Sequence, residues 1–375
     1  MTKTKMLRFT ALWLLMLFVF AFQIQESNCE LSGNAFASSI STGGSSQGLN
    51  DDSLFNYTFE AGKNKLKSGD YAGAINDFTA AINCGDENQD LAIVFLNRGA
   101  AYAHLGNNSA AVDDYNSMLK LRPNSPEAYT NRGLAYHELG KNDLAISDLN
   151  EAVRLAPGQY TVYTNRGVTF GEMGEYEKAI DDFNCAIKLK GNYYYKAYWG
   201  RALAYIGSGK YDLALSDLNL IIDNNFNDFD ARFLRGGVYV IKGDYNRGIS
   251  ALSGVVKYSK DNKPALFLRG MTYIVVGNYD SAVDDFAELV SQHTIIGDAP
   301  INSCLKPIFD WCMPKVLNEQ FEKNNSNAEI IFIRGLVENM RDEKEKSLAD
   351  LNNAVKMKPS LAKKLPWWIR HELTN

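Results

Sequence analysis

An arginine followed directly by a small residue recurs along the chain at almost constant intervals. The pairs are Arg98-Gly99, Arg132-Gly133, Arg166-Gly167, Arg201-Ala202, Arg235-Gly236, Arg269-Gly270 and Arg334-Gly335, with arginines 34, 34, 35, 34, 34 and 65 residues apart. A fixed period near 34 residues is typical of a two-helix unit copied along a solenoid, in which each unit contacts mainly its neighbours. The chain is therefore expected to be all-α and to form one elongated domain.

Each unit also contains a turn glycine and a second apolar helix. The glycines are Gly69, Gly106, Gly140, Gly174, Gly209, Gly243 and Gly277. Glycine is favoured there because a left-handed turn between antiparallel helices is strained for residues that carry a side chain. The second helix of the first unit places Ala74, Phe78 and Ala81 on one face, as packing against a neighbour requires.

This pattern resembles the tetratricopeptide repeat. Gly133, Gly140, Ala145, Leu149 and Pro157 occupy the positions of that family's small residue, turn, apolar core and closing proline. The resemblance implies a right-handed superhelix, an α-solenoid of about eight helix-turn-helix repeats. The expected organisation is a signal peptide at 1–21, a flexible tether at 22–53, repeats one to seven at 54–296, an irregular insertion at 297–327, repeat eight at 328–361, and a capping helix at 362–375 whose Trp367 and Trp368 cover the last repeat.

The N-terminus has the features of a secretory signal. Lys3, Lys5 and Arg8 precede an apolar run from Phe9 to Phe22, and Ala21 ends a small-residue site for cleavage. A secreted or extracytoplasmic location is therefore expected. The alternative is an uncleaved anchor in a membrane, although this run is shorter than the roughly 20 residues that a span needs. Serine, glycine and asparagine are frequent from about residue 30 to residue 53, a composition typical of the flexible tether expected at 22–53.

The charge of the chain argues against nucleic acid as a partner. The net charge is −5, and residues 1–21 contribute three basic residues and no acid to it. An acidic chain lacks the basic surface that binds phosphate backbones. We also expect no interaction with membranes except through an uncleaved N-terminal segment.

No motif indicates catalysis, a cofactor or a metal. The four histidines His104, His137, His293 and His371 show none of the spacings of zinc proteases, and no glycine-rich phosphate loop is present. We therefore expect a non-catalytic protein without cofactor or metal. Cys304 and Cys312 lie eight residues apart in the expected insertion. In an exported protein they could close a disulfide, but the same spacing also suits two turns of helix with unpaired thiols.

The arginines have aspartates sixteen residues after them in most units, and this pairing fails twice. Arg235 would face Ala251, and Asp77 would face Ala61. If each aspartate pairs instead with the arginine of the next unit, then Asp77 finds Arg98, and we favour this ladder between units over pairing within a unit. Arginine suits such a role because its planar guanidinium group binds a carboxylate through two hydrogen bonds. The residues of the expected ladder are Arg98, Arg132, Arg166, Arg201, Arg235, Arg269, Asp77, Asp114, Asp148, Asp182 and Asp217.

Two sets of equivalent positions on the first helices of successive repeats, which we call columns, are candidates for binding a partner on the concave face. Asn97, Asn131 and Asn165 precede three successive arginines. They resemble the asparagine ladder of the protein-binding repeats of O-linked N-acetylglucosamine transferase, which implies hydrogen bonds to the backbone of an extended peptide. An amide can both donate and accept, so it suits that task. The alternative is hydrogen bonding within the array.

The second column becomes apolar and aromatic toward the C-terminus. We expect it to be partly exposed in the inner channel, either for a partner or under the insertion or the C-terminal tail, because an uncovered apolar strip is costly in water. Its residues are Trp199, Leu203, Phe233, Phe267 and Met271.

These features predict a non-catalytic exported scaffold or adaptor that binds an extended peptide or a partner protein on its concave face. The alternative is a regulatory or targeting subunit of an enzyme complex encoded elsewhere.

Overall fold

The computed structural model describes residues 51–85, 90–191, 193–259, 262–292, 327–341 and 343–374. The expected signal peptide at 1–21, nearly all of the tether at 22–53, nearly all of the insertion at 297–327, and both Cys304 and Cys312 lie outside these residues. The described residues form two compact parts, which are considered separately. We call residues 51–208 the N-terminal array and residues 209–374 the C-terminal array.

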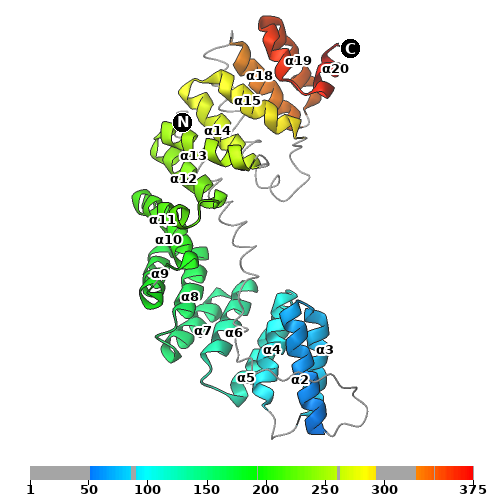
Figure 1. The fold of residues 1–375 in the computed structure, drawn as a ribbon, viewed down its shortest axis with the longest axis vertical. Coiled ribbons are helices and arrows are strands. Elements are labelled where there is room, and N and C mark those ends of the chain that lie inside the picture. The colour runs from blue at the N-terminus through cyan, green and yellow to red at the C-terminus, as the bar shows by residue number, and fades with distance from the viewer. Residues whose placement is uncertain are drawn as a thin grey trace. The chain divides into compact units, whose positions relative to one another are not determined.

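The N-terminal array consists of helices that pack as successive antiparallel pairs (Figure 1). Helices α2 and α3, α4 and α5, α6 and α7, and α8 and α9 form the pairs, and each pair contacts the next. The helices are α2 (Asp51–Ser68), α3 (Tyr71–Cys84), α4 (Leu91–His104), α5 (Asn108–Leu121), α6 (Pro126–Glu138), α7 (Asn142–Leu155), α8 (Tyr160–Glu172), α9 (Tyr176–Lys190) and α10 (Tyr195–Gly207).

The C-terminal array has the same construction. Helix α11 packs on α12, and α12/α13, α14/α15 and α18/α19 are antiparallel pairs, with α15 packed on α18. The elements are α11 (Tyr211–Asn224), α12 (Phe229–Lys242), α13 (Tyr245–Tyr258), α14 (Lys263–Val276), α15 (Tyr279–Ser291), α18 (Ala328–Met340), α19 (Lys344–Met357), the 3-10 helix η2 (Pro359–Lys364) and α20 (Trp367–Thr374).

The C-terminal end differs in detail from the expected capping helix. A 3-10 turn and a short α-helix, separated by Leu365 and Pro366, take the place of one continuous helix. Leu361, Leu365 and Ile369 are the buried residues of this segment, whereas Trp367 is 74% exposed. The expectation that Trp367 covers the last repeat is therefore wrong, because the aliphatic residues provide the cover.

The helix boundaries follow from local chemistry. Each of the seven predicted turn glycines has a positive φ, between 70° and 84°, which confirms the reason for glycine at these positions. Several helices begin at side chains that accept a hydrogen bond from the first turn, as when Asp70 accepts from the Gly73 amide at 2.9 Å. Ser125, Asn107, Asp228, Asp244, Asn262, Asn278 and Asn327 cap other helices in the same way.

The small residue after each arginine is explained by packing within a repeat. A Cβ placed on Gly99 would lie 2.7 Å from the ring of Tyr115, and one on Gly167 would lie 3.1 Å from the ring of Phe183. Both rings belong to the second helix of the same repeat and are buried. A larger residue would therefore force the two helices apart.

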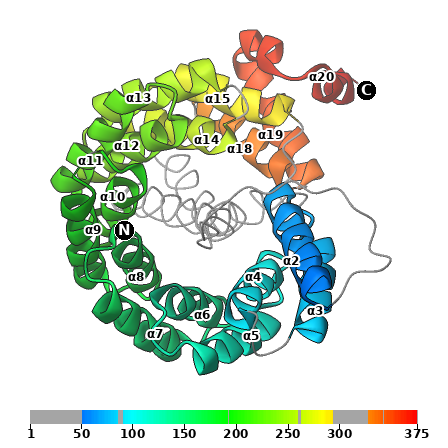
Figure 2. The same cartoon turned by 60° about the horizontal axis from the view of Figure 1, so that its bottom comes forward.

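Within each array the first helices of the repeats lie on the inner side of the curve. Figure 2 shows α4, α6 and α8 inside α5, α7 and α9, and in the C-terminal array α12 and α14 inside α13 and α15. The all-α helix-pair solenoid predicted from the period is thus confirmed. Among the described residues no helix is both long enough and apolar enough to cross a membrane.

Candidate functional site

The arginine column forms ion pairs within repeats. Arg98 donates from Nε to Asp114 Oδ2 at 2.8 Å and from Nη2 to Asp114 Oδ1 at 2.7 Å. The same two-bond arrangement joins Arg132 to Asp148, Arg166 to Asp182, Arg269 to Asp285 and Arg334 to Asp350. Burial raises the pKa of Asp114, while the hydrogen bond to Asp114 raises the pKa of Arg98.

The favoured ladder between units is therefore wrong in its register. Asp77 pairs with Lys65 at 2.8 Å and not with Arg98, and Arg235 forms no ion pair with Asp217. The cause is the small residue beside each arginine, a glycine in every case but Ala202, which lets the second helix of the same repeat come close. A Cβ on Gly167 would lie only 3.2 Å from the Cβ of Asp182, so the carboxylate of that helix is already within reach.

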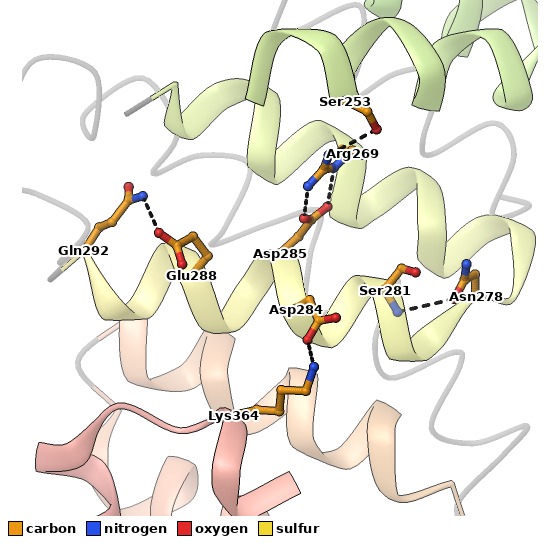
Figure 3. A network of polar contacts seen from close by, with 9 residues as sticks. All are labelled: Ser253, Arg269, Asn278, Ser281, Asp284, Asp285, Glu288, Gln292 and Lys364. Carbon is orange, nitrogen blue, oxygen red and sulfur yellow. Dashed lines mark hydrogen bonds and ion pairs between the residues drawn. The ribbon is translucent and has the colours of Figure 1, made fainter. Parts of the chain in front are cut away.

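Most of these arginines contact the preceding repeat instead through Nη1, the guanidinium nitrogen that does not bond to the aspartate. Arg132 donates from Nη1 to Asn116 Oδ1 at 2.7 Å, and Arg269 donates to Ser253 Oγ at 3.1 Å. Figure 3 shows Arg269 between Ser253 on α13 and Asp285 on α15. The equivalent acceptors are Thr79 for Arg98, Asn150 for Arg166, Asn184 for Arg201 and Asn219 for Arg235. Sequence reasoning missed this column, which stands two residues after each aspartate position.

Aromatic rings flank the same arginines. The Arg166 guanidinium lies 5.8 Å from the ring centre of Tyr163 and 5.9 Å from that of Phe170, which stand three residues before and four residues after it. Arg98, Arg132 and Arg201 are enclosed in the same way. Cation–π contacts of this kind add to the ion pair. The arginine positions are thus structural, and their paired guanidiniums have few donors left for a partner.

The asparagine column lies on the inner helices of the N-terminal array. Asn97 is on α4, Asn131 on α6 and Asn165 on α8. Asn97 donates from Nδ2 to the Ile93 carbonyl at 2.8 Å, inside its own helix. Asn131 is 2% exposed, and its Oδ1 is buried with no hydrogen-bond partner. The Asn165 amide is partly exposed and has no hydrogen bond to another part of the chain that the structure describes.

A histidine–carboxylate pair joins two of these helices. His137 on α6 bonds through Nε2 to Glu172 on α8 and through Nδ1 to Asn142 Oδ1 at 3.1 Å. The bond to Glu172 raises the pKa of His137. His104, by contrast, stacks on Tyr71 with ring centres 4.5 Å apart, and burial lowers its pKa. No group of His, Cys, Asp and Glu suited to a metal occurs among the described residues.

The aromatic column is not an exposed strip, which corrects the expectation. Trp199 is 3% exposed, while Phe233, Phe267 and Met271 are 0% exposed; of the five residues only Leu203 is partly accessible. The same position is also buried in earlier repeats, at Leu96, Thr130 and Thr164. It is therefore a core position throughout. Phe267, for example, packs edge-on against Phe286 of its own repeat with ring centres 6.0 Å apart.

Comparisons with known proteins agree with this architecture. Models described as "TPR repeat" and "Tetratricopeptide repeat" match residues 99–140 and residues 126–159 and 160–193, respectively. A search of the curated proteins found no significant match.

Several solved structures are similar to the chain. A tetratricopeptide repeat protein from Parabacteroides merdae ATCC 43184 is 22% identical with a TM-score of 0.53, covering 68% of this chain and 98% of its own. MamA from Desulfovibrio magneticus RS-1 is 17% identical with a TM-score of 0.44, covering 46% and 98%. A thermophilic protein of the same class from Thermus thermophilus is 20% identical with a TM-score of 0.41, covering 50% and 99%.

The family-model matches identify three consecutive repeats by sequence, and the similarity to the Parabacteroides protein extends the fold over two thirds of the chain. Outside the matched residues, the pairs α12/α13 and α14/α15 have the same glycine turns and the same arginine column, whereas α2/α3 has Ala61 in place of the arginine and the sequence has Asp342 in place of the last turn glycine. The described residues therefore have the fold of a tetratricopeptide repeat solenoid.

Proposed function

We propose that the chain is a non-catalytic scaffold that binds an extended peptide segment along the inner helices of the N-terminal array. Tetratricopeptide solenoids typically serve as protein-interaction scaffolds, and extended curved surfaces suit that purpose. The contacts are the amides of Asn97, Asn131 and Asn165, which hydrogen-bond the peptide backbone. Because an amide both donates and accepts, it can bind a backbone with little regard to the peptide's side chains.

The observation that supports this proposal is the unpartnered Oδ1 of Asn131. Most buried polar atoms in proteins have a hydrogen-bond partner, and an orphaned one costs about 1–3 kcal/mol. Asn165, one repeat further along the same column, also has its amide available, and Asn97 retains a free Oδ1. A bound peptide would supply donors and acceptors to the amides of Asn97 and Asn165, and it would reach the buried Asn131 once the side chains around that amide shift.

The experiment compares binding with stability. Peptides selected from a random displayed library on the full chain are measured against the wild type and the Asn131→Ala/Asn165→Ala variant. Losing two or three neutral hydrogen bonds should weaken binding by about 30-fold or more. Replacing an unsatisfied amide should leave the stability of the free array unchanged or slightly higher.

A matched control uses two exposed asparagines on outer helices, Asn246→Ala/Asn353→Ala, which should bind peptide as the wild type does. Methylating the backbone nitrogens of a selected peptide should abolish binding. If the inner variant instead binds normally and loses stability, the asparagines serve the array and not a partner.

We propose further that this scaffold is exported. The support is the arrangement of Lys3, Lys5 and Arg8 before the apolar run that ends at Phe22.

A further inference from the structure

The sixth repeat keeps its arginine but has lost the carboxylate that pairs with it. Arg235 on α12 is equivalent to Arg98, Arg132, Arg166, Arg269 and Arg334, and each of these binds an aspartate sixteen residues later. Position 251 on α13 is alanine. Alanine and aspartate differ by one carboxylate group, so the missing part is of known size and chemistry.

The backbone around this position has the same geometry as in the complete repeats. A Cβ on Gly236 would lie 3.5 Å from the Cβ of Ala251. The corresponding distances are 3.2 Å for Gly270 and Asp285 and 3.4 Å for Gly133 and Asp148. The two helices are therefore no closer together here than in the complete repeats.

The guanidinium is also held in the common orientation. Arg235 donates from Nη1 to Asn219 Oδ1 at 2.9 Å, as Arg132 does to Asn116. Its Nε is the donor that points at the carboxylate in the complete repeats. Here this Nε is buried and has no acceptor among the described residues. Asp223 attracts Arg235 electrostatically but makes neither a hydrogen bond nor an ion pair with it.

A second arginine increases the positive charge at this place. Arg232 stands three residues before Arg235, where Arg98, Arg132 and Arg166 have an aromatic ring. Its Nε donates to the Phe226 carbonyl at 2.8 Å, while its Nη2 is buried without a hydrogen-bond partner. Burial and the charge of Arg232 both lower the pKa of Arg235. At these two positions the sixth repeat has one cation more and one anion fewer than the repeats of Arg98, Arg132 and Arg166.

We propose that Arg235 and the space beside Ala251 form a binding site for one carboxylate group. The ligand presents two oxygens to Nε and Nη2, as an aspartate side chain does in the neighbouring repeat, and formate is the smallest molecule that can do so. The group belongs either to a small free acid or to the carboxylate end of a larger molecule. This site lies in the C-terminal array and is independent of the peptide site proposed above.

The test is equilibrium dialysis of the full chain against radiolabelled formate, with fluoride as the background anion. The wild type should bind one formate per chain. Ala251→Asp, which restores the internal carboxylate, and Arg235→Gln should each abolish binding. Asn246→Asp adds the same charge to an exposed position on α13 and should leave binding intact. Asp285→Ala, which creates the same gap beside Arg269, should add a second site, with circular dichroism used to verify its fold.

Competition distinguishes the two sources of the carboxylate. Displacement of formate by N-acetylglycine, but not by N-acetylglycinamide, would show that the end of a larger molecule enters. Failure of both to compete would restrict the site to one-carbon acids. The proposal is overturned if the wild type binds no formate, if Ala251→Asp binds as well as the wild type, or if chloride competes as effectively as carboxylates.

Discussion

Replacing Asp182 by alanine would leave Arg166 largely buried without its carboxylate. The Asp182 side chain is 6% exposed and that of Arg166 is 18% exposed, and the bonds that join them measure 2.8 Å and 2.7 Å. Removing one partner of a buried pair typically costs about 3–5 kcal/mol. Arg166 would keep its bond from Nη1 to Asn150 and some contact with water, so we expect about 3 kcal/mol.

Native-state hydrogen exchange is the appropriate measurement because repeat arrays can open locally. A loss of about 3 kcal/mol corresponds to roughly a 100-fold increase in opening, since about 1.4 kcal/mol equals a factor of ten. We expect this increase in the amides of α8 and α9, with a smaller change in the first helices of the array.

The control is Glu151→Ala, which removes an exposed pair between Glu151 and Arg154 on α7. Exposed pairs contribute little, so exchange should stay as in the wild type. If Asp182→Ala changes exchange no more than Glu151→Ala does, the arginine–aspartate pairs do not hold the two helices of a repeat together.

Four further predictions follow from the described contacts. Burial raises the pKa of Glu338 to about 7 from 4.5, so the folded state favours its protonated form; stability of the C-terminal array should fall as pH rises through this window, and Glu338→Gln should remove that fall in thermal unfolding. The bond to Glu172 raises the pKa of His137 from 6.5. The stabilising effect of this pair is therefore complete at lower pH and is lost as pH rises through the folded pKa of His137. The stability difference between the wild type and His137→Gln should disappear at alkaline pH. Phe267→Ala should cost about 3–5 kcal/mol in urea unfolding, whereas Leu213→Ala, at a position that is 49% exposed, should cost far less. Protein recovered from an extracytoplasmic fraction should begin near Phe22 on N-terminal sequencing, and an intact Met1 would contradict export.

The period and its glycines made the fold predictable. A repeat of 34 residues specifies one kind of supersecondary unit, and the turn glycines are needed for a backbone conformation that other residues adopt at a cost. Both features are local, so the sequence contains them directly. The positive φ at Gly106 and Gly140 is the same physical requirement observed in three dimensions.

The partners of the arginines could not be predicted in the same way. Pairing within a repeat and pairing between repeats both place an aspartate at a regular spacing, and the choice depends on the distance between helices. That distance is set by the close contact of Gly99 with Tyr115 and of Gly167 with Phe183, which the sequence shows only as a small and a large residue. The prediction that the aromatic column is exposed failed for a related reason. Three-residue spacing from the glycine fixes a helix face, but whether that face meets a neighbour or solvent depends on how the repeats stack.

The two incomplete repeats show that a missing partner has different consequences on the two sides of the pair. In the first repeat Asp77 has no arginine, but Lys65, one helical turn after Ala61, reaches it at 2.8 Å. In the sixth repeat Arg235 has no aspartate, and no other carboxylate among the described residues makes an ion pair with it. The carboxylate of Asp77 is paired with a long flexible lysine, although its Oδ2 lacks a hydrogen bond, whereas the partly exposed Arg235 is bonded to Asn219 and keeps a buried Nε without an acceptor or an anionic partner in the described part of the chain. Because an unpaired charge at such a place is costly, the carboxylate ligand proposed above would satisfy Arg235.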